Sequence, residues 1–441
     1  MTMASATPGL ENEAVFGGGR PLRGRVRVPG DKSLSHRAVL FAALAKGSSR
    51  LTHVATGEDV AATRCIVELL GVRVRDKRGE LIVTGGGFDA LREPETVLDC
   101  ANSGTSMRVI AGLLAGRPFL SVLNGDGSLR KRPMARVTTP LRLMGARIDG
   151  RDDGRLAPLV LHGGALHGLD YALPVATAQA KSSLILAALQ ADTASNIASP
   201  ALSRDHTERM LIALGAPVRV DGLTVHVEPL SAPWDGFDFD VPADPSSAAF
   251  FAVAATITPG SEVVLESVAI NPTRIGFIEV LRRMGADITV TTTGEFLGEP
   301  VGDIMVRSAS LIATRIEGDE IPSVIDELPA LAMAAAFADG VTEIRDAEEL
   351  AVKESNRIGA IQQELIQLGL GCEAHRDGLT IRGGKPEPGA TLKSHGDHRI
   401  AMAAAVAAHA LDGASTVRGW AVVGVSYPSF AADLERLAGV G

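Results

Sequence analysis

The chain of 441 residues has few aromatic side chains and no excess of basic residues. Phe, Trp and Tyr make up 4% of the residues, and the formal net charge at pH 7 is -9. A nucleic-acid binder needs a basic face and stacking aromatic side chains, so we expect no nucleic-acid partner. Any cluster of cations in this acidic chain must therefore be local.

Cysteine is equally scarce. The three cysteines, Cys65, Cys100 and Cys372, are odd in number and far apart in the sequence. They match neither a disulfide framework nor the Cys/His spacing of a zinc site, so we expect no bound metal. Sparse, unpaired cysteine is typical of a reducing compartment, which predicts a cytoplasmic protein. We also expect Cys65 and Cys100 to be buried.

Hydrophobic runs long enough for a membrane span are missing. The apolar stretches at 328–338 and 400–411 fall well short of the roughly 20 residues that a bilayer requires, so we predict buried helices and no membrane association. The first 25 residues lack the apolar segment of a signal peptide, and Glu11 and Glu13 do not suit a transit peptide. We expect this segment to be a loose arm.

What the sequence does contain is a segment that recurs six times: an amphipathic stretch, a glycine close behind Leu or Met, and then alternating apolar positions. The six glycines are Gly71, Gly145, Gly215, Gly285, Gly369 and Gly439. A glycine can adopt the left-handed conformation just after a helix, so each one predicts a helix end followed by a strand. The intervals of 70 to 84 residues exceed the 20 to 50 of solenoid repeats and indicate an α/β supersecondary unit.

Each unit also contains an alanine-rich helix. The alanine-rich segments are 34–47, 106–116, 181–191, 246–255, 327–340 and 398–413. Small apolar side chains on nearly all faces predict helices that are packed by neighbours all round. Capping explains the Ser, Thr, Asn and Asp at their N-termini, but not the Lys, Arg and Gln found there as well. Several such N-termini converging on one place would bind anions strongly.

The repeats predict two domains of three units each. The predicted boundaries are 29–241 for the first domain and 1–28 with 242–441 for the second. The opening segment precedes the first unit, so we expect it to pair with the second domain. The two crossings, near 25–30 and 240–244, would act as hinges for closure over a ligand. Extra length in the fourth unit, at 291–303, predicts a long hairpin to which we assign no function.

Basic residues gather beside predicted helix starts and turns. They are Lys32, Arg37, Arg108, Arg130, Lys131, Arg132, Lys181, Arg204, Lys353, Arg357 and Arg399. Arg offers a planar fork and Lys a mobile point charge for carboxylates and phosphates. Together these residues predict a site for a polyanion, or for two anions held close together. The glycine-rich loops of nucleotide-binding proteins are missing, so we expect no nucleotide.

Two carboxylates stand among these cations. Asp326 precedes an alanine-rich helix, which it could simply cap, and Glu354 lies beside Lys353 and Arg357, with which it could form a surface ion pair. Alternatively, cations hold each carboxylate ionised until a dry cleft closes and a proton is exchanged.

At this point ten segments resemble, in order, the motifs of the 5-enolpyruvylshikimate-3-phosphate synthase family. The segments are PGDKSLSHRA, NSGTSMR, GDGSLRKRPM, ATAQAKSS, SRDHTERM, PADPSSAAF, NPTRIG, IDELPALA, VKESNR and GDHRIAMA, spread over about residues 20 to 435. The combination of GDKSLSHR, NSGT and DHRIAM is highly specific. RPM, AQAKSS, RDHTE and NPTR are similar to the second class of the family.

The resemblance implies a fold and a reaction. The implied fold is a two-domain inside-out α/β barrel of six βαβαββ units, three per domain, with the active site in the interdomain cleft. The implied reaction transfers the enolpyruvyl group of phosphoenolpyruvate to the 5-hydroxyl of shikimate 3-phosphate through a tetrahedral intermediate, releasing phosphate, in the shikimate pathway to chorismate and the aromatic amino acids. It also implies a monomer that needs no cofactor.

The resemblance carries site residues with it. Phosphoenolpyruvate would be held by Lys32, Gly104, Arg132, Gln179, Arg357 and Arg399. Shikimate 3-phosphate would lie against Lys32, Ser33, Arg37, Thr177, Ala178, Gln179, Arg204, Asp326 and Lys353. Asp326 would take the hydroxyl proton, Glu354 would exchange the proton at C3, and Lys32 would serve in the proton relay.

The chain departs from many family members at one position, since Val425 stands where they carry a lysine. It resembles the glyphosate-sensitive members at Gly104, which tolerant members replace with alanine, and this implies inhibition by glyphosate. Two other functions remain as alternatives. UDP-N-acetylglucosamine enolpyruvyl transferase shares the fold but carries KNAALP and a reactive loop cysteine, which this sequence lacks. A non-catalytic anion-binding module would not need both Asp326 and Glu354.

Overall fold

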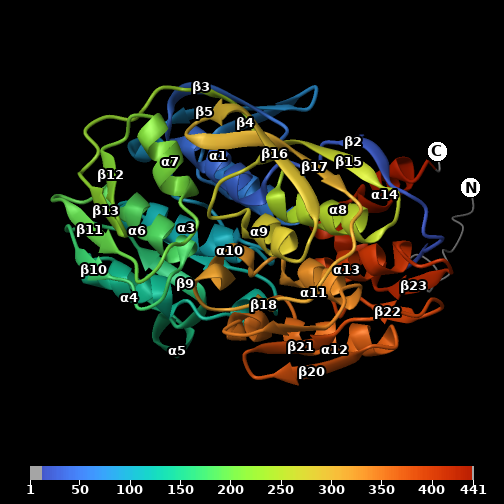
Figure 1. The fold of residues 1–441 in the computed structure, drawn as a ribbon. Helices are drawn as coiled ribbons and strands as arrows, with labels where there is room; N and C mark the ends of the chain where they lie inside the picture. Colours follow the sequence, from blue (N-terminus) through green and yellow to red (C-terminus); the bar gives the residue numbers. More distant parts are fainter. Residues whose placement is uncertain (1–11, 440–441) are drawn as a thin grey trace, which may run out of the picture.

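The computed structural model describes residues 12–439, whose helices and strands form two triplets of small sheets side by side (Figure 1). In each of the six sheets one pair of neighbouring strands is parallel and the other pairs are antiparallel. In Figure 1 the cyan and green elements of the first triplet lie on the left, and the orange and red elements of the second lie on the right. The predicted α/β class is confirmed.

The first triplet contains three four-stranded sheets. Its helices are α1 (Lys32–Leu44), α2 (Glu58–Leu69), α3 (Gly104–Ala115), α4 (Ala135–Leu143), α5 (Arg151–Gly154), α6 (Ala178–Ala188) and α7 (His206–Ala213), with short 3-10 helices η1 (Phe88–Ala90) and η2 (Leu129–Lys131). Its strands are β3 (Lys46–Thr52), β4 (Arg73–Lys77), β5 (Glu80–Gly86), β6 (Leu98–Asp99), β7 (Leu120–Asn124), β8 (Arg147–Gly150), β9 (Leu156–His162), β10 (Asp170–Ala172), β11 (Ser195–Ala198), β12 (Val218–Asp221), β13 (Thr224–Val227) and β14 (Asp238–Asp240). The strand orders are β14-β3-β5-β4, β6-β7-β9-β8 and β10-β11-β13-β12.

The second triplet contains two four-stranded sheets and one three-stranded sheet. Its helices are α8 (Pro245–Ile257), α9 (Gly276–Arg283), α10 (Ile321–Val324), α11 (Leu328–Ala336), α12 (Arg357–Gln367), α13 (His398–His409) and α14 (Phe430–Leu437), with η3 (Gly318–Glu320), η4 (Glu348–Val352) and η5 (Trp420–Val425). Its strands are β1 (Glu13–Phe16), β2 (Arg23–Val26), β15 (Glu262–Ala269), β16 (Asp287–Phe296), β17 (Glu299–Arg307), β18 (Arg315–Ile316), β19 (Val341–Ile344), β20 (Gly371–His375), β21 (Gly378–Arg382), β22 (Thr391–Lys393) and β23 (Ser415–Arg418). The strand orders are β16-β17-β15-β2, β18-β19-β21-β20 and β1-β23-β22.

The chain passes between the triplets by exchanging strands. β2 leads into α1 of the first triplet but pairs with β15 of the second, while β14 leads into α8 of the second but pairs with β3 of the first. The two crossings bond to each other: the Asp31 N–H donates to the Pro242 carbonyl at 2.7 Å, and the Asp244 N–H donates to the Pro29 carbonyl at 2.9 Å. The N-termini of α1 and α8 are thereby held together.

The repeated glycines end the amphipathic helix of each unit, as predicted. All six have a positive φ, between 70° and 101°. At Gly71 the glycine N–H donates to the Glu68 carbonyl and the Val72 N–H reaches back to the Val67 carbonyl, which is the Schellman pattern of bonds. A side chain would be strained at this φ, so each glycine fixes where its helix stops. A strand follows the first five glycines, and the strand expected after Gly439 falls on residues 440–441, outside the described residues.

Each triplet has its own hydrophobic core, built around three alanine-rich helices. One cluster of buried side chains runs from Leu34 to Val241, with Ala269 added, and the other joins residues 16–28 to 243–437. The small side chains allow close packing of α3 on α6, and of α11 and α13 on α8. The apolar stretches at 328–338 and 400–411 are buried helices, as expected.

Three expectations need correction. Residues 13–26 are not a loose arm, because β1 pairs with β23 and β2 pairs with β15. The expected pairing of this segment with the second triplet is thereby confirmed. Residues 1–11 lie outside the described part. Cys100 is buried but Cys65 is exposed, because it lies with Ala61 and Glu68 on the outer face of α2. The sixth unit is incomplete, since β1 occupies the place beside β23 that a hairpin fills elsewhere.

The fourth unit carries the expected long hairpin. β16 and β17 pair over nine register positions around a turn at Leu297 and Gly298. The hairpin reaches across to the first triplet, where Leu297 packs against the core of that triplet.

Candidate active site between the triplets

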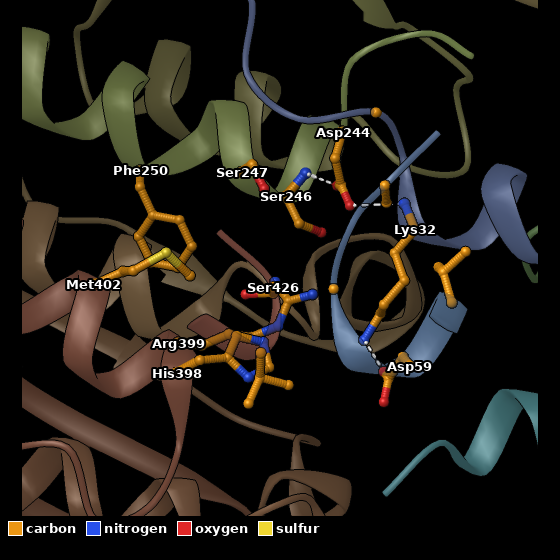
Figure 2. A pocket seen from close by; sticks show the side chains of 15 residues that line it. Lys32, Asp59, Asp244, Ser246, Ser247, Phe250, His398, Arg399, Met402 and Ser426 are labelled. Atoms are coloured by element: carbon orange, nitrogen blue, oxygen red, sulfur yellow. Dashed lines mark hydrogen bonds and ion pairs between the residues drawn. The ribbon is translucent and has the colours of Figure 1, made fainter. Parts of the chain in front are cut away.

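The helix start that carries Lys32 faces a carboxylate of α2 (Figure 2). Asp31 caps α1 by accepting a hydrogen bond from the Leu34 N–H at 2.7 Å, so Lys32 is the first residue of the helix. Lys32 Nζ lies 2.9 Å from Asp59 Oδ2. Burial disfavours the charge of Lys32, but Asp59 outweighs it and raises the pKa of the ammonium. Lys32 is therefore a cation at neutral pH.

The inner face of α1 carries a buried arginine. Arg37 donates from Nε to Thr207 Oγ1 at 2.7 Å, from Nη2 to Ser182 Oγ at 2.8 Å, and from Nη1 to the Ser33 carbonyl. Burial lowers the pKa of Arg37 to about 10, so it stays protonated at pH 7. The guanidinium links the starts of α1, α6 and α7.

A second group of polar side chains joins α3 to α6. Gln179 accepts from Arg108 Nη1 at 2.5 Å and donates to Thr105 Oγ1 at 2.9 Å. Arg132 Nη2 donates to Asn102 Oδ1 at 2.7 Å. Burial, with the charge of Arg132, lowers the pKa of Arg108 to about 10. Two guanidinium groups thus lie near each other beside two helix N-termini.

Gly104 is the first residue of α3 and lies under these guanidinium groups. A Cβ at this position would stand 2.9 Å from Arg108 Nη1 and 3.5 Å from Arg132 Nη1. At the neighbouring helix start, Thr177 is the N-cap of α6 but makes no side-chain capping bond, and Ala178 is the first helical residue. The bare backbone N–H groups of α6 are available to an anion.

Asp326 lies at the centre of a cluster of cations. It precedes Glu327, the N-cap residue of α11, so it does not cap the helix. Its carboxylate pairs with Arg204 of the first triplet, and its Oδ1 lies 3.5 Å from both Lys353 Nζ and Arg357 Nη1. Burial would raise the pKa of Asp326, but these cations hold it well below its usual range. Asp326 is an ionised acceptor that contacts both triplets.

Glu354 shares the same arginine. Arg357 Nη2 lies 2.6 Å from Glu354 Oε2, and Arg357 Nε lies 2.8 Å from Asp397, the N-cap of α13. Burial opposes ionisation of Glu354, but Arg357 lowers its pKa, with help from Lys32, His398 and Arg132. The Glu354 side chain is 26% exposed and therefore accessible to a small molecule.

Arg399 is the last of the predicted cations beside Asp326. Arg399, in the first turn of α13, donates from Nη1 to the Asp326 carbonyl at 3.0 Å and is 7% exposed. Its neighbour His398 is buried, and burial with the charges of Arg399 and Lys32 lowers the pKa of His398 to about 4. The imidazole is neutral at pH 7.

A cavity lies between the triplets beside Lys32. It is lined by the starts of α1, α2, α8 and α13, and by Val425 and Ser426 at the end of η5. In Figure 2 Lys32 and Arg399 approach this space from opposite sides. Val425 contributes an apolar side chain to the wall of the cavity.

Several of the predicted residues meet across the boundary between the triplets, since Arg204 pairs with Asp326 and the charges of Lys32 and Arg132 act on Glu354. Lys32, Ser33, Arg37, Gly104, Arg132, Thr177, Ala178, Gln179 and Arg204 come from the first triplet, and Asp326, Lys353, Glu354, Arg357 and Arg399 from the second. Arg130 and Lys131, which the sequence also offered as anion-binding cations, are exposed residues of the 3-10 helix η2.

Sequence reasoning overlooked some members of the site. Asp59 and Asp397 are the partners of Lys32 and Arg357, and Asn102 is the partner of Arg132. Asp59 in the first turn of α2 and Asp397 at an N-cap look like ordinary helix-start residues, so only their contacts reveal them.

Within residues 12–439, no group of three or more His, Cys, Asp and Glu side chains could hold a metal ion. No helix in this range is long and apolar enough to cross a membrane.

Comparisons with known proteins agree with this architecture. The enolpyruvyl transferase NikO from Streptomyces tendae, at 19% identity, has a similar fold with a TM-score of 0.78 over 97% of both chains. The EPSP synthase from Acinetobacter baumannii is 41% identical, with a TM-score of 0.87 over 97% of this chain and 98% of that one. The fold is therefore the two-domain inside-out α/β fold of the enolpyruvyl transferases.

The sequence comparisons are more specific. A family profile described as EPSP synthase (3-phosphoshikimate 1-carboxyvinyltransferase) matches residues 17–434. The 3-phosphoshikimate 1-carboxyvinyltransferase of Desulforudis audaxviator is 51% identical over 95% of this chain and 97% of its own length. That of Geobacillus kaustophilus is 50% identical over 94% and 98%. The chain belongs to the EPSP synthase family.

Proposed function

We propose that this chain transfers the enolpyruvyl group of phosphoenolpyruvate to the 5-hydroxyl of shikimate 3-phosphate, in the shikimate pathway, and that the residues between the triplets carry out the reaction. The observation that carries this assignment is the sharing of Arg357 by two carboxylates, Asp326 and Glu354, among cations from both triplets. Anion binding alone would be weakened by two carboxylates, whereas proton transfer requires them.

Shikimate 3-phosphate binds mainly to the first triplet in this proposal. Its phosphate binds to the backbone N–H groups at the start of α6, at Thr177, Ala178 and Gln179. The guanidinium of Arg204 donates to the same phosphate. Arg204 then exchanges part of its pairing with Asp326 for the phosphate. Ser33, Arg37 and Lys32 border the same space from α1, and Asp326 and Lys353 meet the ring hydroxyls from the second triplet.

Phosphoenolpyruvate carries a carboxylate and a phosphate, and its two anionic groups need several cations at once. We assign them to Lys32, Arg132, Arg357 and Arg399, with Gly104 and Gln179 beside them. The charges of Arg357, Lys32 and Arg132 all lower the pKa of Glu354, so three of these cations lie close to one carboxylate. Fixed cations stabilise charge on the tetrahedral intermediate without the cost of reorganisation.

The chemical steps then follow. Asp326 accepts the proton of the 5-hydroxyl as its oxygen attacks C2 of phosphoenolpyruvate, and Glu354 donates a proton to C3. This gives a tetrahedral intermediate with a methyl group. Glu354 then takes a proton back from that methyl group while the C2–O bond to phosphate breaks, which forms the enolpyruvyl product and inorganic phosphate. Lys32 supplies or accepts protons at the departing phosphate.

Glu354 must hold a proton to act as an acid, although Arg357 and Lys32 keep it ionised in the structure. Phosphoenolpyruvate removes this obstacle when its anionic groups take Arg357 and Lys32 as partners, because the pKa of Glu354 then rises. The substrate itself thus prepares the general acid.

We further propose that the domains divide at 28/29 and 241/242 and close about the paired crossings. Support comes from the two separate cores and from the bonds between Asp31 and Pro242 and between Asp244 and Pro29. The same proposal includes inhibition by glyphosate, a monomeric state and a cytoplasmic location, the last supported by three free cysteines.

Phosphate release tests the function directly. With purified protein, phosphoenolpyruvate and shikimate 3-phosphate together should release inorganic phosphate, and neither alone should do so. Phosphate release with UDP-N-acetylglucosamine in place of shikimate 3-phosphate would favour the related enolpyruvyl transferase instead. No release with either acceptor would leave only the anion-binding alternative.

A further inference from the structure

Six consecutive residues at the start of α7 bond to both triplets. Arg204 pairs with Asp326, Asp205 accepts from Asn271, His206 bonds to Glu299 and Arg274, Thr207 accepts from Arg37, Glu208 pairs with Lys181, and Arg209 donates to the Gly298 carbonyl. Residues 204, 205, 206 and 209 thus contact the second triplet, while 207 and 208 contact the first. The segment is a junction between the triplets.

His206 is the most enclosed residue of this junction. Its side chain is fully buried, its Nδ1 lies 2.8 Å from Glu299 Oε1, and its Nε2 lies 3.3 Å from Arg274 Nη1. Arginine can only donate, so Nε2 must accept, which leaves the proton on Nδ1 to be donated to Glu299. One neutral tautomer therefore satisfies both partners.

Arg274 connects the junction to the crossings. It is 2% exposed, and it donates to Asp31 Oδ2 at 2.8 Å, to Asp244 Oδ1 at 3.3 Å and to Ser246 Oγ at 3.0 Å. Asp31 and Asp244 are the N-caps of α1 and α8, which follow the two crossings. A fully buried arginine with two carboxylate partners holds its position firmly, because any displacement would leave a charge unpaired.

Glu299 reaches His206 because the hairpin of the fourth unit is long. Glu299 is the first residue of β17, directly after the turn at Leu297 and Gly298, and it is fully buried. Its other oxygen accepts from Asn271 Nδ2 at 3.0 Å, so Glu299 is anchored to its own triplet. The long hairpin thereby places one carboxylate between the triplets, against His206 of the first and Asn271 of the second.

We propose that Glu299, His206 and Arg274 form an interdomain clamp that positions Arg204 for shikimate 3-phosphate. The three are positioning residues, since they act through Arg204, which lies two residues before His206. This inference rests on the proposed function, in which Arg204 binds the phosphate. A misplacement of about 1 Å in a binding group is enough to cost on the order of 10²-fold in rate.

Removal of the anchoring carboxylate tests the clamp. Glu299→Ala should raise the KM for shikimate 3-phosphate about tenfold or more, while the KM for phosphoenolpyruvate changes less than about threefold. Glu299→Gln should raise the KM for shikimate 3-phosphate less than Glu299→Ala does, because its amide oxygen still accepts the His206 N–H although its NH2 group loses the bond from Asn271 Nδ2. Glu349→Gln is the matched control: it weakens the exposed interdomain pair with Arg136 and should change neither KM by more than about twofold.

A double variant separates positioning from a general structural role. If the clamp acts through Arg204, Glu299→Ala added to Arg204→Ala should raise the KM for shikimate 3-phosphate by less than about twofold more. A further tenfold rise in the KM for shikimate 3-phosphate in that background, or equal rises in both KM values, would overturn the proposal.

If Glu299→Ala does not fold, His206→Asn replaces it, since its amide can still donate to Glu299 but loses the bond to Arg274. The wild-type protein in the same assay tests the function separately, because an inactive wild type would refute the function and not the clamp.

Discussion

Arg204 of the first triplet and Asp326 of the second form an ion pair across the interface between the triplets. The two side chains are 23% and 15% exposed, so the pair is partly screened by water but not free in solution. It joins a residue that we assign to the phosphate of shikimate 3-phosphate to one that we assign to its 5-hydroxyl. The pair therefore sets the relative position of the two ends of one substrate.

Arg204→Lys tests the geometry of this pair. Lysine keeps the charge but replaces the planar fork by a single point charge, so it cannot hold the phosphate and Asp326 together. We expect the KM for shikimate 3-phosphate to rise by about tenfold, the cost of one lost charge-assisted hydrogen bond. Steady-state kinetics with phosphoenolpyruvate saturating gives the answer, and an unchanged KM would remove Arg204 from the phosphate site.

Glu354→Gln tests the proton transfer at C3. The amide keeps the size of the side chain and a bond from Arg357 but cannot carry a proton, so kcat should fall about 10²–10⁴-fold, the usual contribution of a general acid–base group. The control is Glu349→Gln, which lies five residues away at an exposed ion pair and should retain wild-type kcat. Near-wild-type kcat in Glu354→Gln would assign the C3 proton to another group.

Acid sensitivity should depend on Asp31. The pKa of Asp31 is lowered to about 2 by Arg274 and other cations that outweigh its burial. A folded-state pKa below the unfolded value stabilises the protein above that value, and the gain disappears as the pH falls through the folded pKa. From the ordinary aspartate pKa of 3.8, the contribution is about 2 kcal/mol at pH 7 and about 1 kcal/mol at pH 3.

The measurement is urea unfolding of wild type and Asp31→Asn at several pH values. Asparagine can still cap α1 through its side-chain oxygen but does not titrate. The difference in free energy of unfolding between the two proteins should shrink by about 1 kcal/mol from pH 7 to pH 3. A difference that stays constant over this range would show that Asp31 does not titrate as the structure requires.

Gly104 should control sensitivity to glyphosate. A Cβ there would stand 2.9 Å from Arg108 Nη1 and 3.5 Å from Arg132 Nη1, so the Arg108 guanidinium would have to shift. One extra methyl group in a tight pocket changes binding by about 10–200-fold. We expect glyphosate to inhibit the wild type, and Gly104→Ala to need a concentration at least tenfold higher, with a raised KM for phosphoenolpyruvate. Equal inhibition of both proteins would contradict this assignment.

Local sequence signals were enough to predict the repeated unit. The six glycines and the alanine-rich helices follow from backbone sterics and small side chains, which depend on neighbours in the sequence. The pairing of the opening segment with the second domain followed from its place before the first unit, but the strands β2 and β14 themselves leave no local signal, because each is short and its partner lies more than 180 residues away. The expectation of a loose arm failed for the same reason.

The site was predictable only in part. The cations and Asp326 occur in motifs that resemble a known family, so sequence comparison could place them. The burial of Arg274, and the reach of the long hairpin that brings Glu299 to His206, depend on the packing of the triplets. No periodicity or composition reveals them, since a charged residue in a sequence is normally read as exposed.

Deuterium incorporation at C3 is the sharpest test of the proton transfer that we assign to Glu354. In D₂O, donation from Glu354 to C3 forms a CH₂D group, and removal of one of its hydrogens leaves deuterium in the enolpyruvyl methylene of the product. We predict deuterium at that carbon with the wild-type protein, detected by mass spectrometry and proton NMR, and a fall of about 10²–10⁴-fold in the rate at which deuterated product forms with Glu354→Gln. Product formed by the wild type in D₂O without any deuterium at C3 would contradict the mechanism.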